Sequence, residues 1–460
     1  MESIKIKFFG TDGIRGNSSK FPFYNSALWI IGKSIVEIFG NKGYIFIIRD
    51  TRESGKRIQK ELARGIISCG VKLIFGGIMP TAAASLIVQN LKYSTAIVIS
   101  ASHNSYIDNG IKIFNSNGLK LDDLMETRIE DTINKNLNMK PCFFKKKVFI
   151  KEEKTFFLKI YKNFIIKNFL ANNLKNKTII LDCANGVSSK YATYILKKLG
   201  AKVVALNIKP NGKNINLNCG SLYPNKLAKI VKYKKAFCGF AFDGDGDRLV
   251  CIDEKGIVRD GDYFLASMAI WLKNKGKLKN NILITNFMSN FGLLQLEKRE
   301  NINIIFSEGV GDKYISEDVK KYQASIGGEQ SGHFIFGDIL PTGDGMLSAI
   351  MILSALCDTN NSMSKFMDVI KKLPQIVINK KILKKVPINK LLNSCELIKH
   401  YKKYFGKNGR ILIRYSGTEN IIRVMVESKK IKKIKEIAMN IANSIEKEIV
   451  YMLCNSSKNT

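Results

Sequence analysis

The fold is decided by the stretch AFCGFAFDGDGDR at residues 236–248, where a short apolar run leads directly into three aspartates that alternate with glycines. The apolar residues 236–242 predict a buried β-strand, and Asp243, Asp245 and Asp247 follow at its carboxyl end. In open α/β sheets, ligands bind at this end of the strands. The stretch therefore predicts an α/β domain with a ligand site at the edge of its sheet.

The three aspartates favour a metal site. Carboxylates at alternate positions repel one another, so bringing them together is favourable only around a cation. The glycines let the backbone turn so that all three reach one ion, and oxygen ligands suit Mg²⁺ rather than Zn²⁺. A solvent-exposed acidic turn and a Ca²⁺ loop are the alternatives. An EF-hand loop is disfavoured because Glu254, twelfth from Asp243, follows the strand-like run LVCI.

Other predicted strands also end in polar loops. SASHNS at 100–105 follows a strand at 95–99, GGEQSGH at 327–333 follows one at 324–326, and RYSGTEN at 414–420 follows one at 411–414. Amphipathic patterns typical of helices, such as residues 28–39, lie between strands. This alternation predicts parallel α/β layers whose loops gather at the carboxyl ends of the strands.

The serine loop offers a nucleophile. Ser102 lies where a strand gives way to a loop, and His103 is one of three histidines in the chain. Alone, the serine would be explained as a helix N-cap and the histidine as a surface residue. A GxSxG elbow is missing, which disfavours an acyl-transfer hydrolase. Beside an acidic metal cluster, the hydroxyl instead favours a phosphoryl carrier.

The two remaining loops carry groups suited to a phosphorylated sugar. Acceptors and donors for hydroxyls and an amine are present in GGEQSGH as Glu329, Ser331 and His333. Donors for a phosphate are present in and near RYSGTEN as Arg414, Ser416, Gly417, Thr418 and Arg423. Guanidinium groups bind phosphate through two parallel hydrogen bonds. Either loop, taken alone, could be an ordinary polar turn.

Length and composition limit the class of protein. The 460 residues are 45% hydrophobic, enough for three or four domains of roughly 100–200 residues. We find no apolar run of about 18 residues and no secretory signal in MESIKIKFFG, so we expect a cytoplasmic protein without a membrane partner. The nine cysteines form no CxxC pair, which disfavours a zinc site.

The net charge of +35 has two explanations. A basic surface could attract polyanions or phosphorylated molecules. Alternatively, an A+T-rich gene could have drifted toward lysine codons, and the scattered lysines favour this explanation over a dedicated nucleic-acid surface. Even so, a positive field helps a phosphorylated substrate to arrive.

Taken in order, five motifs resemble the α-D-phosphohexomutase superfamily: FGTDGIRG at 9–16, SASHNS, DGDGDR, GGEQSGH and RYSGTEN. Together with GVGDKY at 309–314 and RVMVE, they are most similar to the bacterial branch that acts on glucosamine phosphates. The resemblance implies three α/β domains and a smaller α+β C-terminal domain around a central cleft. The boundaries that we expect are 1–150 with the phosphoserine loop, 151–256 with the metal loop, 257–368 with the sugar loop and 369–460 with the phosphate loop.

The resemblance also implies a role for each matching residue. One Mg²⁺ per subunit would be held by Asp243, Asp245, Asp247 and the phosphorylated Ser102. Arg15 and Arg248 would neutralise the transferring group, and His103 and Lys112 would transfer protons. The sugar would be oriented by Glu329, Ser331 and His333. The phosphate that is not transferred would be bound by Arg414, Ser416, Gly417, Thr418 and Arg423.

The activity implied is the interconversion of glucosamine 6-phosphate and glucosamine 1-phosphate through a phosphoserine and a bisphosphate, which supplies UDP-N-acetylglucosamine synthesis. Two alternatives stay open. The first is a phosphomannomutase or phosphoglucomutase with the same mechanism. The second is a basic nucleic-acid-binding protein on the same fold, although we expect no dedicated nucleic-acid partner. The sequence leaves open whether the chain forms a homodimer.

The chain departs from the family pattern at three positions where proline is common, namely Ala82, Ser105 and Asn420. Each loss of proline increases the entropy of the unfolded chain and costs about 0.4–1 kcal/mol. None of them removes a chemical group from the site, so we expect lower stability rather than a changed activity.

Overall fold

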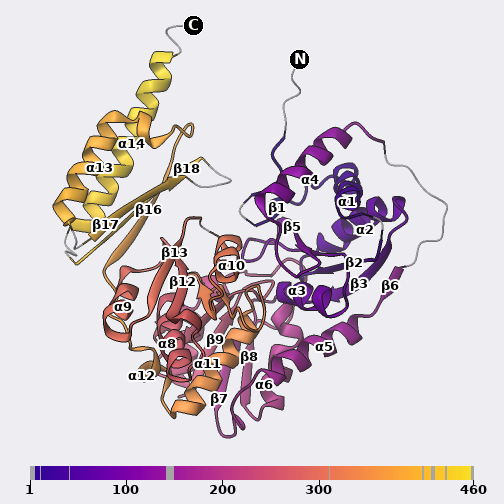
Figure 1. The fold of residues 1–460 in the computed structure, drawn as a ribbon, viewed down its shortest axis with the longest axis horizontal. Coiled ribbons are helices and arrows are strands. Elements are labelled where there is room, and N and C mark those ends of the chain that lie inside the picture. Colours follow the sequence, from indigo (N-terminus) through magenta and orange to yellow (C-terminus); the bar gives the residue numbers. More distant parts are fainter. Residues whose placement is uncertain are drawn as a thin grey trace. The chain divides into compact units, whose positions relative to one another are not determined.

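The computed structural model describes residues 6–10, 12–40, 42–140, 150–309, 311–406, 409–415, 420–429 and 433–456. The chain forms two compact units (Figure 1). The first contains residues 1–289 and 296–370, and the second contains residues 290–295 and 371–460.

The first layered domain of the large unit is built on a mixed sheet with the strand order β1-β5-β4-β2-β3-β6. Its strands are β1 (Ile14–Asn17), β2 (Tyr44–Arg49), β3 (Lys72–Ile78), β4 (Thr95–Ile99), β5 (Asp108–Asn115) and β6 (Ile150–Glu152). Its helices are α1 (Asn25–Phe39), α2 (Gly55–Ser68), α3 (Thr81–Asn90), α4 (Asp123–Asn136) and α5 (Lys154–Lys167). The predicted parallel arrangement holds for β4, β2, β3 and β6, whereas β5 runs antiparallel to both of its neighbours, β4 and β1.

Helices cover both faces of this sheet. Ile45 and Ile47 of β2 join the apolar core formed with α1, α2 and α4. Phe46 points to the opposite face, because successive side chains of a strand alternate, and its ring lies 4.9 Å from that of Phe157 in α5. The sheet is therefore buried on both sides, and its loops are the parts that can reach a ligand.

Helices α1 and α2 approach each other closely through two glycines. A Cβ atom on Gly65 would lie 2.0 Å from the carbonyl oxygen of Trp29, and one on Gly32 would lie 2.3 Å from that of Leu62. Backbone atoms cannot move aside as a flexible side chain can. We expect Gly65→Ala to lower the free energy of unfolding by about 1–3 kcal/mol, measured by chemical denaturation.

A matched control lies in the same helix. The nearest atoms to a Cβ on Gly55 would belong to the flexible side chain of Arg49, with the Cδ at 3.3 Å. Gly55→Ala should therefore leave stability unchanged or raise it slightly, since alanine favours a helix over glycine. Equal stability of the Gly65 and Gly55 variants would contradict the close packing of α1 against α2.

The second layered domain has the strand order β11-β10-β9-β7-β8, in which β7, β8 and β9 are parallel. Its strands are β7 (Thr178–Asp182), β8 (Lys202–Leu206), β9 (Cys238–Phe242), β10 (Leu249–Ile252) and β11 (Val258–Arg259). Its helices are α6 (Ala192–Lys198), α7 (Asn225–Tyr233) and the short 3-10 helices η1 (Val187–Lys190) and η2 (Gly220–Leu222). The aspartate loop joins β9 to β10, which turns back antiparallel beside it.

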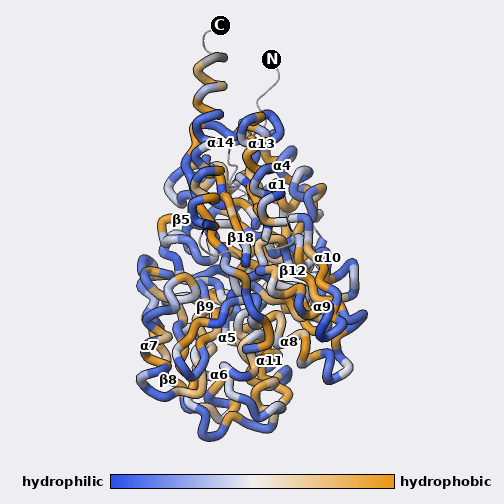
Figure 2. The backbone as a smooth tube through the Cα atoms, turned by 90° about the vertical axis from the view of Figure 1, so that its left-hand side faces the viewer, coloured by the Kyte–Doolittle hydropathy of each residue, from blue (hydrophilic) through white to orange (hydrophobic). Residues whose placement is uncertain are grey.

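The third layered domain has the order β13-β12-β14-β15. Its strands are β12 (Ile282–Asn286), β13 (Asn303–Ser307), β14 (Ile326–Gly328) and β15 (Phe334–Ile335). Its helices are α8 (Gly261–Asn274), η3 (Lys279–Asn281), α9 (Gln295–Glu300), α10 (Asp312–Lys321), α11 (Gly345–Thr359) and α12 (Met363–Met367). Hydrophobic stretches run along α8 and α11 (Figure 2), and the stacked rings of Phe264 and Phe334, 3.9 Å apart, join α8 to β15.

The second unit is an antiparallel sheet of order β16-β18-β17 with two long helices. Its elements are η4 (Phe291–Leu294), β16 (Gln375–Lys381), η5 (Ile388–Lys390), α13 (Leu392–Phe405), β17 (Gly409–Tyr415), β18 (Ile421–Ser428) and α14 (Ile434–Ser456). Its own apolar core includes Val424 and Val426 of β18 and Ile441 and Ile445 of α14.

The structure confirms the α/β fold class and most of the predicted elements, with three differences. The lysine-rich segment 371–385, for which the sequence pattern predicts no strand, contains strand β16. The strands predicted at 236–242 and 324–326 begin two residues later, at Cys238 and Ile326. Strand β6 of the first sheet extends to Glu152, two residues past the boundary expected at 150. The domain boundaries themselves stay a prediction.

Within the described ranges, none of the helices combines the length and the hydropathy needed to cross a membrane.

Candidate active site

The serine loop begins where the fully buried strand β4 ends. Ser102 is 1% exposed, adopts a positive φ of 51°, and donates a hydrogen bond of 2.6 Å from its Oγ to Oδ2 of Asp243. The Nδ1 atom of His103 lies 3.3 Å from the same Oγ. The fold therefore brings together the predicted nucleophile and the first predicted metal ligand, which are 141 residues apart in the chain.

The three aspartates after β9 are all buried, and each offers a carboxylate oxygen within 4.8 Å of the others. One oxygen of Asp245 and one of Asp247, Oδ1 in both cases, have no hydrogen-bond partner among the described residues. Burial and the charges of Asp247 and Asp245 raise the pKa of Asp243 well above its usual value. Unpaired buried carboxylate oxygens that repel one another are suited to binding a cation.

Lys112 of strand β5 already supplies one positive charge to this cluster. Its Nζ lies 3.0 Å from Asp12, 2.9 Å from Asp245 and 3.1 Å from Asp247. Burial alone would lower the pKa of Lys112, but these three carboxylates raise it well above the ordinary value. Thr81 also donates a 2.7 Å hydrogen bond to Oδ2 of Asp245. Lys112 is thus a charged ammonium, which can donate a proton but has no lone pair to accept one.

The two predicted arginines surround His103 with positive charge. Arg15 forms an ion pair with Asp12, and the backbone N–H of Arg248 donates to Oδ1 of Asp243 at 3.2 Å. Burial, together with the charges of Arg248 and Arg15, lowers the pKa of His103 to about 3. The imidazole is therefore neutral at physiological pH and can accept a proton.

The sugar loop follows β14 and is held by its neighbours. Asn286, at the end of β12, donates a 2.6 Å hydrogen bond to Oε1 of Glu329, and Ser331 donates one of 3.2 Å to Oε2. The backbone N–H of Glu329 donates to the carbonyl of His333 at 2.9 Å. The predicted residues of this loop thus lie together, and Asn286 fixes the direction of the carboxylate.

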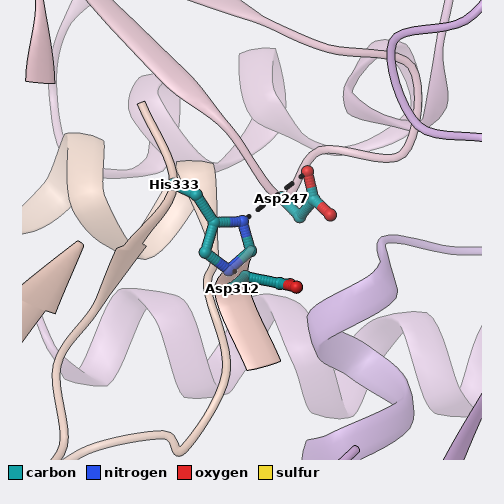
Figure 3. Close-up of side chains that lie close together, drawn as sticks. All are labelled: Asp247, Asp312 and His333. Atoms are coloured by element: carbon teal, nitrogen blue, oxygen red, sulfur yellow. Dashed lines mark ion pairs between the residues drawn. The ribbon is translucent and has the colours of Figure 1, made fainter. Parts of the chain in front are cut away.

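His333 connects the sugar loop to the metal loop (Figure 3). Its Nδ1 lies 3.9 Å from Oδ1 of Asp247, and its Nε2 lies 3.3 Å from Oδ2 of Asp312. Each ring nitrogen faces a different carboxylate. A backbone bridge between Arg248 and His333 joins the same two loops.

Sequence reasoning missed a second set of ion pairs beside these residues. Lys120 pairs with Asp12 and Asp312, and Lys313 lies 2.5 Å from Asp123 and 3.1 Å from Glu126. Asp12 lies within the motif FGTDGIRG, and Asp312 and Lys313 lie within GVGDKY. The sequence thus contains the motifs, but it does not indicate that these residues form ion pairs. The pairs join the first layered domain to the start of α10.

The residues predicted to bind the phosphate that is not transferred belong to the second unit. Arg414 of β17 and Arg423 of β18 are direct cross-strand partners. Two arginines at paired positions concentrate positive charge on one part of the sheet. Ser416, Gly417 and Thr418 lie outside the described residues, so their predicted roles are not tested.

The chain matches four models of phosphoglucomutase/phosphomannomutase domains. These are α/β/α domain I at residues 7–140, domain II at 155–256, domain III at 260–373 and the C-terminal domain at 368–444. The fold is similar to that of a phosphoglucomutase/phosphomannomutase family protein from Burkholderia thailandensis, with a TM-score of 0.79 at 20% identity over 96% of this chain and 97% of that one.

Two further relatives concern amino sugars. The N-acetylphosphoglucosamine mutase of Aspergillus fumigatus, solved with GlcNAc-6P and magnesium, shares the fold with a TM-score of 0.67 at 14% identity, covering 96% of both chains. The phosphoglucosamine mutase of Syntrophotalea carbinolica is 38% identical over 97% of this chain and 98% of its own length. The chain belongs to the phosphoglucosamine mutase family of phosphohexomutases, which are isomerases.

Proposed function

We propose that the protein interconverts glucosamine 6-phosphate and glucosamine 1-phosphate through a phosphoserine at Ser102 and a hexose bisphosphate, and so supplies UDP-N-acetylglucosamine synthesis. One observation carries the proposal. The Oγ of Ser102 is buried 2.6 Å from Asp243, the first of three clustered aspartates, and the other two each have a carboxylate oxygen, Oδ1, that suits a cation. A hydroxyl beside such a cluster is arranged for phosphoryl transfer, which needs positioning and charge neutralisation more than covalent chemistry.

The donor set fits Mg²⁺. Asp243, Asp245 and Asp247 would hold one ion together with an oxygen of the phosphate on Ser102, because all these ligands are hard oxygen atoms. The ion, when bound, supplies positive charge that neutralises the phosphoryl group. Lys112 neutralises part of the same cluster from its other side, since it pairs with Asp245 and Asp247.

The protein's own residues provide the proton transfers. When a phosphoryl group leaves Oγ of Ser102 for a sugar hydroxyl, the P–Oγ bond breaks, a P–O bond to the sugar forms, and the hydroxyl proton must leave. The neutral imidazole of His103 can take that proton. In the reverse step the imidazolium of His103 returns that proton to the sugar oxygen, and Lys112, which is held as an ammonium, can donate a hydrogen bond there. Arg15 and Arg248 add positive charge beside the reacting group.

Two loops would hold the substrate. Glu329, Ser331 and His333 would orient the sugar, and the buried carboxylate of Glu329 suits the ammonium of glucosamine. The phosphate that stays in place would be bound by Arg414, Ser416, Gly417, Thr418 and Arg423. The bisphosphate must turn round to present its other phosphate to Ser102. Each of its two phosphates therefore has to fit these phosphate-binding residues in turn.

The test is turnover of phosphorylated, Mg²⁺-loaded protein on glucosamine 6-phosphate, mannose 6-phosphate and glucose 6-phosphate in parallel. We expect the highest kcat/KM with glucosamine 6-phosphate. A preference for mannose or glucose phosphate would favour the phosphomannomutase or phosphoglucomutase alternative. Salt-sensitive polyanion binding without turnover would instead favour a nucleic-acid-binding protein.

Three further expectations accompany this function. The phosphorylated amino sugar is the partner that the site suits, a cytoplasmic location is a prediction from the sequence, and the sequence leaves a homodimer open. Size-exclusion chromatography with light scattering would decide between monomer and dimer.

A further inference from the structure

We propose that Arg52 and Asn216 are positioning residues of the phosphoryl transfer, which hold the backbone of the serine loop so that Oγ of Ser102 is aimed at the aspartates. The inference rests on the proposed function, in which Ser102 carries the phosphoryl group. Neither residue was singled out from the sequence, and neither touches the aspartates in the contacts of the described residues.

The two side chains bind the same two carbonyl oxygens. The Nη2 atom of Arg52 donates to the carbonyls of Ser102 at 3.1 Å and Asn104 at 2.7 Å. The Nδ2 atom of Asn216 donates to the same carbonyls at 2.9 and 3.0 Å. Arg52 follows strand β2 and Asn216 follows strand β8, so the first and second layered domains each contribute one donor. We name this arrangement, Arg52 and Asn216 on the carbonyls of Ser102 and Asn104, the carbonyl clamp.

The serine loop needs such support because its conformation is unfavourable by itself. Ser102 has a φ of 51°, in the left-handed region that residues other than glycine disfavour. Its carbonyl and that of Asn104 converge on one point, where their dipoles repel unless donors lie between them. Strained backbone of this kind persists only where the surroundings fix it, and it is concentrated at functional sites.

The burial of Arg52 is explained better by the clamp than by stability. Arg52 is 1% exposed and forms an ion pair with Asp50, which is 0% exposed and also accepts the backbone N–H of Arg52 at 2.8 Å. A buried ion pair contributes little net stability, because desolvation offsets the attraction. The pair instead fixes the direction of the Arg52 guanidinium, which donates hydrogen bonds to the serine loop.

The position of the clamped carbonyl also decides where Oγ lies. A Cβ atom on Gly244, between Asp243 and Asp245, would lie only 2.7 Å from the carbonyl oxygen of Ser102. The serine loop and the metal loop are thus in direct backbone contact. If the carbonyl rotated away, Oγ would lose its 2.6 Å alignment with Asp243, and in-line transfer is sensitive to shifts of that size.

The first test is Asn216→Gly. Asn216 has a φ of 58°, so glycine removes both hydrogen bonds that Nδ2 of Asn216 donates without straining the backbone. We expect kcat with glucosamine 6-phosphate to fall at least about tenfold while KM changes less than about twofold, because alignment is lost and no sugar contact is removed. The matched control is Asn218→Gly, which lies in the same loop with a φ of 52° and an exposed side chain. It should keep the kcat of the unaltered protein.

The second test is Arg52→Lys. Lysine keeps the charge that Asp50 needs but lacks the forked guanidinium that reaches the carbonyls while pairing with Asp50. The clamp predicts a loss of kcat like that of Asn216→Gly, whereas a purely structural ion pair predicts normal kcat. A normal kcat in either variant, or a rise in KM that matches the fall in kcat, overturns the proposal.

A third readout does not depend on catalysis. Hydrogen–deuterium exchange of a peptide covering residues 100–105 should be faster in Asn216→Gly than in Asn218→Gly and the unaltered protein. Unchanged exchange there overturns the clamp. If the unaltered protein turns over none of the hexose phosphates, the proposed function fails, and the exchange measurement still decides for or against the clamp.

Discussion

Replacing Ser102 with alanine is expected to lower mutase turnover by at least about 10⁴-fold. The hydroxyl is the covalent carrier in the proposed mechanism, and no neighbouring residue can replace it, because Oγ alone contacts Asp243 from the serine loop among the described hydrogen bonds. Stability should change by no more than about 1–2 kcal/mol, since only one hydroxyl and its hydrogen bond are lost.

The measurement is steady-state turnover together with mass spectrometry of the intact protein after incubation with a hexose bisphosphate. The alanine variant should stay unphosphorylated. Ser105→Ala is the matched control, since it removes an exposed hydroxyl from the same loop and should keep turnover and labelling. Near-normal turnover of Ser102→Ala would contradict the phosphoserine mechanism.

The parts of the site that could be predicted are those that directly follow a local sequence pattern. A buried strand shows itself by its apolar run, and the residues that follow it must lie at the carboxyl edge of the sheet. This rule led to Ser102 after β4, the aspartates after β9 and Glu329 after β14, and the structure places all of them in the large unit. The same rule also applies to Arg52, which lies three residues after the end of β2 but was not predicted as a site residue.

The parts that the sequence did not predict depend on partners distant in the chain. Lys120 contacts Asp312 across 192 residues, and nothing near either residue indicates the other. Strand β16 was not predicted for a different reason. It lies at the edge of its sheet, next to β18, and its lysines and asparagine interrupt the apolar pattern of a strand. Polar residues on an edge strand remove the apolar pattern that predicts a strand, and they also discourage pairing with other chains.

The structure also changes the meaning of two predicted residues. His103 and Lys112 were both expected to transfer protons, without a distinction between them. Their surroundings separate them, because burial and nearby arginines lower the pKa of His103 to about 3, whereas carboxylates raise that of Lys112. His103 is therefore neutral and Lys112 charged, so of these two groups His103 is the one with a lone pair that can accept a proton. Such shifts depend on which charges the fold brings near, which spacing in the sequence does not reveal.

Asp245→Asn is expected to weaken Mg²⁺ binding and catalysis together. Oδ2 of Asp245 accepts from Thr81 at 2.7 Å and Lys112 at 2.9 Å, whereas Oδ1 has no partner and is the oxygen free to bind an ion. In the variant, the amide oxygen can keep the two hydrogen bonds. The amide nitrogen would then occupy the place of Oδ1, where it cannot act as a ligand.

The expected size follows from the lost charge and the lost ligand. We expect the Mg²⁺ concentration for half-maximal activity to rise at least about tenfold, and kcat at saturating Mg²⁺ to fall on the order of 10². The measurement is a Mg²⁺ titration of turnover, supported by isothermal calorimetry of Mg²⁺ binding, which does not depend on activity.

Asp182→Asn is the matched control for this titration. Asp182 is a buried aspartate at the end of strand β7, and it accepts hydrogen bonds from the backbone of Ala184 and Gly220 and from the side chain of Asn207. Neutralising Asp182 can reduce stability, because both of its oxygens accept hydrogen bonds within the protein. It should leave the Mg²⁺ concentration for half-maximal activity unchanged. An unchanged midpoint in Asp245→Asn would remove Asp245 from the ligand set.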